Sequence, residues 1–105
     1  MVFIETSIFT KQILQLLDDE EYRLLQSQLA VRPEMGSIIP GSGGLRKVRW
    51  ASKGHGKRGG LRTIYYWAVA KDQILLLFVY SKNATADLTA TQLKLLRQVV
   101  ERDYP

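Results

Sequence analysis

The chain has 105 residues, of which 46% are hydrophobic, with 15 Lys and Arg against 10 Asp and Glu and no Cys. This length fits one folded domain, which we assign to residues 1–105, and the apolar content is too high for a disordered chain. The lack of Cys excludes a disulfide scaffold and a thiolate zinc site, and it fits a cytoplasmic location. The apolar runs are far shorter than the about 20 residues that cross a bilayer, so we expect no membrane partner.

The first third of the chain has one apolar start followed by helical patterns. Residues 2–4 (Val-Phe-Ile) predict a short strand, and Thr6 or Ser7 can cap the helix that follows. Asp18 is placed to cap a second helix, which Pro33 should end.

Strand patterns follow the turn-rich segment at residues 40–44. Within residues 46–51, Val48 and Trp50 point to one side while Lys47 and Arg49 point to the other. This segment therefore predicts a strand with one core face and one cationic face.

The last part of the chain predicts two more strands and a helix. Residues 61–70 are rich in β-branched and aromatic side chains, and the apolar run at 74–82 indicates a strand buried on both faces. Thr89 and Gln92 have capping-box spacing for a final helix.

The predicted order is β-α-α-β-β-β-α. Sequential strands joined by short connections predict an α+β domain, a small antiparallel sheet with helices on one face. The other face would carry Lys47 and Arg49, and Arg62 would join them if the strand register allows.

The charges are unevenly distributed. Residues 35–71 contain eight Lys and Arg and no Asp or Glu, so this stretch carries +8 and the remainder −3. Such segregation predicts one electropositive face, for which nucleic-acid phosphate is the commonest partner. The alternative is a solvated basic hairpin, although a surface that serves only solubility would mix both signs.

The chemistry open to these residues is limited. One His and no Cys argue against a metal site, and the Gly-x-Gly pairs lack the context of a nucleotide-binding loop, so we expect no cofactor. RNA supplies its own 2′-OH nucleophile, and Lys and Arg can stabilise charge on the phosphorane. His55 is a candidate general acid or base or an exposed loop residue, while Tyr65 or Tyr66 can stack on a base or pack in the core.

Four motifs together resemble the RelE/ParE toxin superfamily, and the branch most similar is the HigB-like, RelE-type toxins of bacterial toxin–antitoxin modules. The matching segments are Gly43–Arg49, Ala51–Gly60, Arg62–Tyr66 and Tyr80–Asn83. Several RelE toxins have a tyrosine near the final helix and some HigB toxins have histidines, whereas this chain reads Ala84–Leu88 in that stretch. The resemblance therefore assigns no proton-transfer residue.

The resemblance implies a microbial RNase-type fold and a metal-independent endoribonuclease that cleaves mRNA in the ribosomal A site by attack of the 2′-OH on the scissile phosphate. The implied catalytic residues are Lys47, Arg49, Arg62 and Lys82. We expect contacts to RNA or the ribosome from Arg46, Lys53, His55, Lys57, Arg58 and Tyr66.

The implied partners are the ribosome, mRNA and a cognate antitoxin, expected to be a helix-turn-helix DNA-binding protein. The antitoxin either covers the basic face with an acidic segment or docks elsewhere and makes the complex too bulky for the A site. Two other functions remain open, a non-catalytic toxin that poisons a protein target such as DNA gyrase and a plain RNA- or DNA-binding module.

Overall fold

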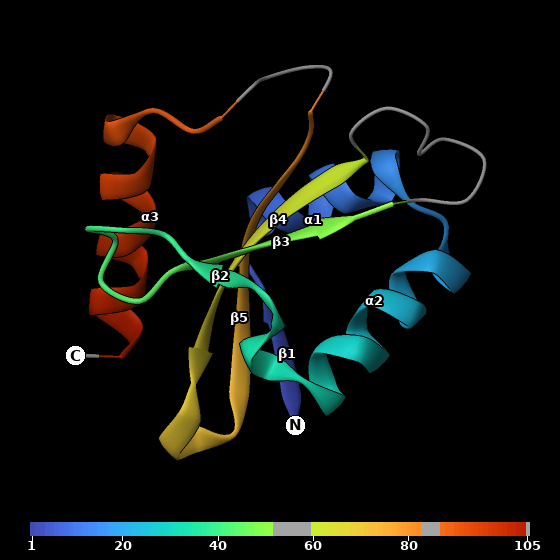
Figure 1. The fold of residues 1–105 in the computed structure, drawn as a ribbon, viewed down its shortest axis with the longest axis horizontal. Coiled ribbons are helices and arrows are strands. Elements are labelled where there is room, and N and C mark those ends of the chain that lie inside the picture. The colour runs from blue at the N-terminus through green and yellow to red at the C-terminus, as the bar shows by residue number, and fades with distance from the viewer. Residues whose placement is uncertain (52–59, 83–86, 105) are drawn as a thin grey trace.

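Three α-helices and five β-strands make up the part of the chain that the computed structural model describes, residues 1–51, 60–82 and 87–104 (Figure 1). In chain order they are β1 (Val2–Glu5), α1 (Ser7–Leu16), α2 (Asp19–Val31), β2 (Ser37–Ile38), β3 (Arg46–Trp50), β4 (Leu61–Ala68), β5 (Gln73–Ser81) and α3 (Ala90–Asp103). The predicted α+β class is confirmed. The sequence pattern did not predict β2, because a two-residue strand has too little alternation to recognise. No helix in the described residues is long and apolar enough to cross a membrane.

The strands form one sheet in the order β1-β5-β4-β3-β2. Strands β2 to β5 pair antiparallel, but β1 pairs parallel to β5, so the sheet is mixed rather than antiparallel as expected. The chain passes through α1 and α2 after β1, which gives it the long connection that a parallel pair needs. Strand β1 thereby supplies the outer neighbour of β5.

The helices cover both faces of the sheet, which corrects the expectation that they share one face. Helices α1 and α2 pack on one side, where Phe9 and Leu25 meet Leu76 of β5. Helix α3 packs on the other side, where Val100 joins a cluster with Leu75 of β5. Since β5 is apolar on both faces, each face needs its own cover. Figure 1 shows the sheet between α3 on the left and α2 on the right.

Helix starts follow the predicted capping residues. The Thr6 side chain accepts from the Phe9 backbone N–H at 3.1 Å, and the Asp18 carboxylate accepts from that of Glu21 at 2.8 Å. Helix α3 begins with a complete capping box between Thr89 and Gln92. The local chemistry of these residues thus sets where each helix begins.

Strands β3 and β4 lie side by side at the start of β4 because Gly60 permits a close approach. Gly60 has φ +54°, and a Cβ built there would lie 2.3 Å from the Trp50 carbonyl oxygen. Only glycine fits both the conformation and the space. This contact helps to hold the pair of strands that carries the cationic residues.

Candidate functional site

One row of side chains crosses three neighbouring strands on the α3 face of the sheet. Arg49 of β3 is paired with Arg62 of β4, and Arg62 is paired with Tyr80 of β5. Directly opposed residues have Cβ atoms about 5 Å apart, so these side chains are neighbours. Lys47 lies two residues before Arg49 on the same side of β3. We call Lys47, Arg49, Arg62 and Tyr80 the site row.

The members of the site row differ in exposure. Arg62 lies on a central strand and is 7% exposed, whereas Arg49 is exposed and the Lys47 side chain is 24% exposed. Val48, between the two cations on β3, packs in the opposite core. The predicted alternation of β3 is therefore confirmed, and it presents Lys47 and Arg49 on one side.

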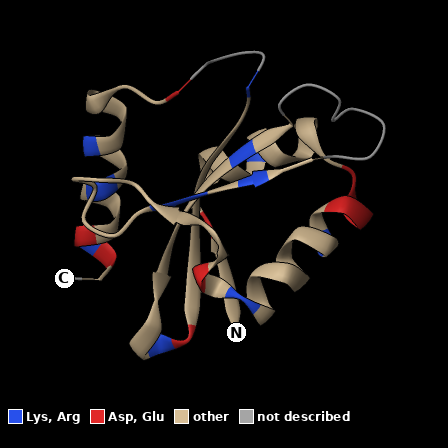
Figure 2. Ribbon diagram, in the orientation of Figure 1, with Lys and Arg blue, Asp and Glu red and all other residues tan. Residues whose placement is uncertain are grey.

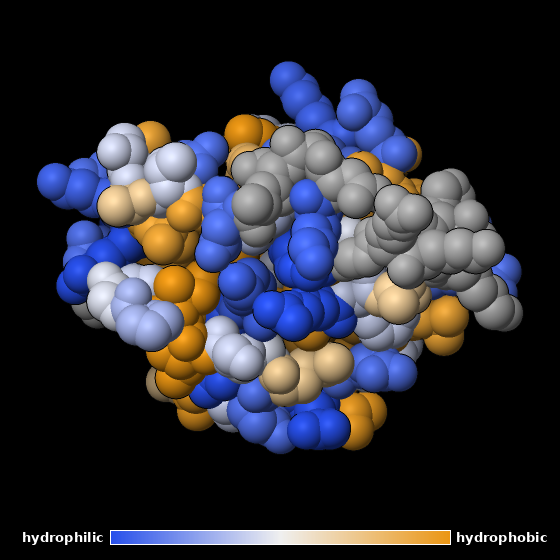
Figure 3. All heavy atoms as spheres, turned by 45° about the horizontal axis from the view of Figure 1, so that its top comes forward, coloured by the Kyte–Doolittle hydropathy of each residue, from blue (hydrophilic) through white to orange (hydrophobic). Residues whose placement is uncertain are grey.

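The basic side chains gather where the sheet is not covered by α3. Figure 2 shows Lys and Arg along β3 and the start of β4, while much of the acidic charge lies at the ends of helices and in turns. In the space-filling view, strongly hydrophilic side chains collect near the centre of this face and apolar ones lie beside them toward α3 (Figure 3). The predicted electropositive face is thus formed from neighbouring strands.

Tyr80 is a site residue to which the sequence analysis assigned no role, although it begins one of the four matching motifs. Burial raises the pKa of its phenol, and the charge and hydrogen bonding of Asp87 raise it further. The nearby Arg62 and Arg49 lower that pKa in part. The phenol is therefore protonated at neutral pH and can donate a proton or a hydrogen bond. Only the pairing register with Arg62 reveals this placement, and sequence alternation does not give register.

Asp87, just before α3, was also missed. Its Oδ1 lies 3.5 Å from the Lys47 Nζ and accepts from the Tyr80 hydroxyl at 3.3 Å and from the Leu88 backbone N–H at 3.0 Å. The Leu88 N–H and, with it, the Lys47 ammonium hold the pKa of the Asp87 carboxyl below its usual range, against a smaller opposing effect of burial. A carboxylate thus sits on the site row.

Two of the residues expected to contact RNA lie away from this row. Arg46 is on the opposite side of β3, and its Nη1 donates to the carbonyls of Glu34 and Gly36 at 3.1 and 2.8 Å. Tyr66 packs against Tyr104 with ring centroids 5.7 Å apart, beneath the end of α3. Both side chains help to hold the fold, and their contact with RNA stays a prediction.

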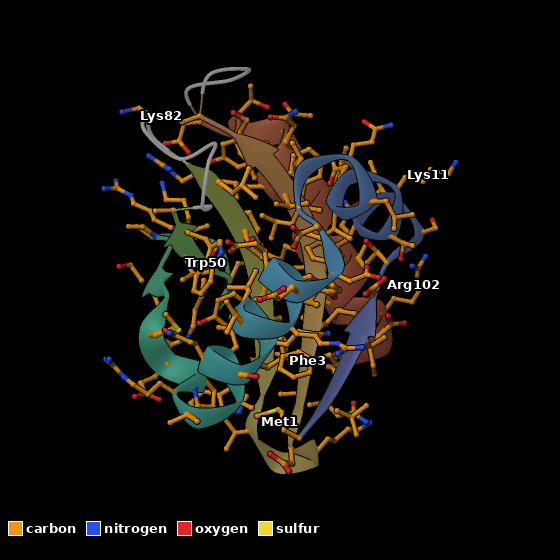
Figure 4. All side chains as sticks on the ribbon, turned by 90° about the vertical axis from the view of Figure 1, so that its right-hand side faces the viewer. Met1, Phe3, Lys11, Trp50, Lys82 and Arg102 are labelled. Carbon is orange, nitrogen blue, oxygen red and sulfur yellow. The ribbon has the colours of Figure 1, made fainter. Side chains whose placement is uncertain are left out.

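Lys82 lies directly after β5 and is exposed. Its backbone N–H donates to the Gly60 carbonyl at 3.3 Å, which ties the end of β5 to the start of β4. Figure 4 shows its side chain extending outward at the end of the sheet, whereas Trp50 points inward. The expected residues Lys53, His55, Lys57 and Arg58 lie outside the described residues.

The chemistry of the site row is that of cations beside a neutral phenol. Within residues 1–51, 60–82 and 87–104, no group of His, Cys, Asp or Glu could hold a metal ion. Arg and Lys side chains can bind a phosphate and stabilise added negative charge on it, and a phenol can supply a proton. The arrangement suits a phosphodiester ligand.

Comparison with known proteins shows which family profile matches this sequence and which solved structures share its fold. A family profile described as the RelE toxin of the RelE / RelB toxin-antitoxin system matches residues 8–103. The intact E. coli RelBE toxin–antitoxin complex contains a chain that matches with a TM-score of 0.58 and 13% identity, covering 76% of this chain and 94% of that one. A free E. coli RelE variant with two arginines replaced by alanine matches with a TM-score of 0.57 and 16% identity, covering 81% and 86%. At these identities the structures establish a shared fold.

Proposed function

Because this chain belongs to the RelE toxin family, whose profile spans residues 8–103, we propose that it is a ribosome-dependent endoribonuclease that cleaves translated mRNA in the ribosomal A site and so inhibits translation. The observation that carries the proposal is the site row, in which Arg49, Arg62 and Tyr80 are direct neighbours on three strands. A toxin that acts only by binding a protein does not need cations side by side on neighbouring strands of one sheet face.

The reaction that fits these groups begins with attack of the RNA 2′-oxygen on the adjacent phosphorus. The 2′-OH gives up its proton to a solvent water molecule, the bond to the 5′-oxygen breaks, and the products are a 2′,3′-cyclic phosphate and a 5′-OH. Arg62, Arg49 and Lys47 stabilise the negative charge of the phosphorane. Tyr80, whose raised pKa keeps it protonated, supplies a proton to the departing 5′-oxygen.

Lys82, which the resemblance implies to be catalytic, has in our proposal a role in binding rather than in bond breaking. Lys82 extends from the end of β5 toward solvent, where it can contact a neighbouring phosphate of the mRNA or ribosome (Figure 4). We assign the same role to Lys53, Lys57 and Arg58, and place the chain in the cytoplasm with the ribosome.

A cognate antitoxin is the second partner that we propose. One of the matched structures is a toxin–antitoxin complex, that of E. coli RelBE, and it supports an equivalent protein for this chain. An enzyme that cleaves translated messages needs such an inhibitor in the cell that makes it. We expect it to be a helix-turn-helix DNA-binding protein.

Brief induction of the chain in bacteria, followed by mapping of transcript 5′ ends, tests the function. We expect new 5′ ends inside translated codons. Arg49→Ala and Arg62→Ala should each slow cleavage about 10²–10³-fold, because one lost charge contact removes about 2–4 kcal/mol of transition-state stabilisation. Arg102→Ala, an exposed arginine on α3, is the control and should cleave normally.

Arg62 is buried, so its replacement can disturb the fold, whereas Arg49 is exposed and its replacement should not. The Arg49 variant therefore tests the loss of charge separately from misfolding. Circular dichroism should show each variant folded. Intact transcripts together with inhibited DNA gyrase would contradict the proposal and favour a toxin that binds a protein target.

A further inference from the structure

Asp87 brings a negative charge to a face whose own segment has none. Residues 35–71 contain no Asp or Glu, yet the Asp87 carboxylate lies 3.5 Å from the Lys47 ammonium. The carboxylate comes from the segment after β5, forty residues further along the chain. The fold therefore places an internal anion on the strand that carries Lys47.

The Asp87 carboxylate makes the contacts that a phosphate oxygen would make. Its Oδ1 accepts from the Tyr80 hydroxyl at 3.3 Å and lies beside Lys47, which are two of the four members of the site row. A third donor is the Leu88 backbone N–H at 3.0 Å, close to the start of α3. Charged side-chain donors and backbone N–H groups near a helix start are also the usual ligands of phosphate.

The carboxylate is poorly suited to remain there during catalysis. A phosphorane gains negative charge, and an anion held on the same ammonium would repel it. Service as a general base is also disfavoured, because the pKa of Asp87 is held low and the carboxylate is a weak proton acceptor. With its side chain 68% exposed, Asp87 can instead leave the site row for solvent.

We propose that the Asp87 carboxylate occupies the phosphate-binding position in the RNA-free protein, where it contacts Lys47 and Tyr80. A phosphate of the bound RNA then displaces this carboxylate. This inference rests on the proposed function, because it takes RNA as the ligand of the site row. It adds that the site row is partly neutralised until RNA arrives, so the chain binds RNA more weakly than its cations alone would allow.

Binding of a single-stranded 2′-O-methyl oligoribonucleotide, which lacks the nucleophile and stays uncleaved, tests this competition by fluorescence anisotropy. Asp87→Asn removes the charge but keeps an oxygen that can accept from Leu88 and Tyr80. We expect it to bind about fivefold more tightly at 0.1 M salt, in line with the size of an exposed ion pair. The plot of log affinity against log salt should steepen by about 0.7, the value of one added contact to a single strand.

Two further proteins separate local competition from a general change in charge. Asp103→Asn makes the same charge change at the far end of α3 and should alter affinity less than twofold. Introduced into a Lys47→Ala background, Asp87→Asn should give less than a twofold gain, because the ammonium that it frees is gone. Circular dichroism checks that each protein is folded.

The inference is overturned if Asp87→Asn binds no more tightly than the parent, if neither binds, or if the gain persists without Lys47. The experiments can support or refute this inference independently of the proposed function. A gain that depends on Lys47 with intact cellular transcripts supports the displacement and refutes the nuclease, whereas cleaved transcripts without that gain do the reverse.

Discussion

Tyr80 combines packing and chemistry in one side chain. The residue is 5% exposed within the α3-side cluster, its ring centroid lies 6.0 Å from that of Phe78, and its hydroxyl donates to Asp87. The ring therefore fixes where the hydroxyl lies, at the end of the row formed with Arg62 and Arg49. A rigidly held donor is what a proton transfer of fixed geometry requires.

Tyr80→Phe keeps the ring and removes the hydroxyl. We expect cleavage of mRNA on programmed ribosomes to slow about 10²–10⁴-fold, the usual contribution of a general acid, with ribosome binding unchanged. Single-turnover cleavage and sedimentation with ribosomes measure the two effects separately. Tyr104→Phe, a control at the far end of α3, should cleave at the parent rate. Equal rates for Tyr80→Phe and the parent would remove Tyr80 from the mechanism.

At the scale of elements, α3 covers one face of the sheet and begins beside the site. Its capping box pairs the Thr89 Oγ1 with the Gln92 backbone N–H at 3.1 Å and the Gln92 Oε1 with the Thr89 backbone N–H at 2.8 Å. Asp87 lies two residues before this cap. The start of α3 therefore also sets where the Asp87 carboxylate can reach.

Thr89→Ala should lower the free energy of unfolding by about 1 kcal/mol, because it leaves a helix N–H without its side-chain acceptor. Urea denaturation measures the change. Thr91→Ala, an exposed position in the first turn of α3, is the matched control and should change stability by less than about 0.5 kcal/mol. Similar losses in both variants would show that the cap itself contributes nothing special.

Local signals in the sequence predicted the elements better than their assembly. Capping by Asp18 and Thr89 and the two-sided pattern of β3 depend on neighbours in the chain, and the structure confirms them. The parallel pairing of β1 and the position of α3 on the second face depend on contacts between distant segments. No local pattern contains that information.

The site shows the same division. Lys47 and Arg49 were placed on one face by strand alternation, and Arg62 was left conditional on the register, which the Arg49–Arg62 pair now supplies. Tyr80 and Asp87 were missed because one needs the register of β5 and the other the path of the chain back to β3. Tyr80 lies in an apolar run that predicts only a buried strand. Asp87 lies just before a helix, where an acidic residue is common.

At the scale of the whole molecule, four buried or half-buried tyrosines link stability to alkaline pH. Burial is the largest cause of a raised pKa at Tyr22, Tyr65, Tyr80 and Tyr104 relative to the ordinary value of 10.0. Above about pH 10 the unfolded chain loses phenolic protons that the folded chain keeps. Rising pH therefore favours unfolding from that point upward, while below pH 10 these groups are protonated in both states and contribute no pH dependence.

Tyr22 carries the largest of these effects, because the Glu5 carboxylate accepts its hydrogen bond and adds to the influence of burial. Tyr22→Phe removes one such proton, so its free energy of unfolding should fall between pH 10 and 12 less steeply than that of the parent, by up to about 1.4 kcal/mol per pH unit. Urea denaturation at closely spaced pH values measures both slopes, and the titration of lysines cancels in their difference. Parallel slopes would mean that Tyr22 ionises alike in the folded and unfolded chains.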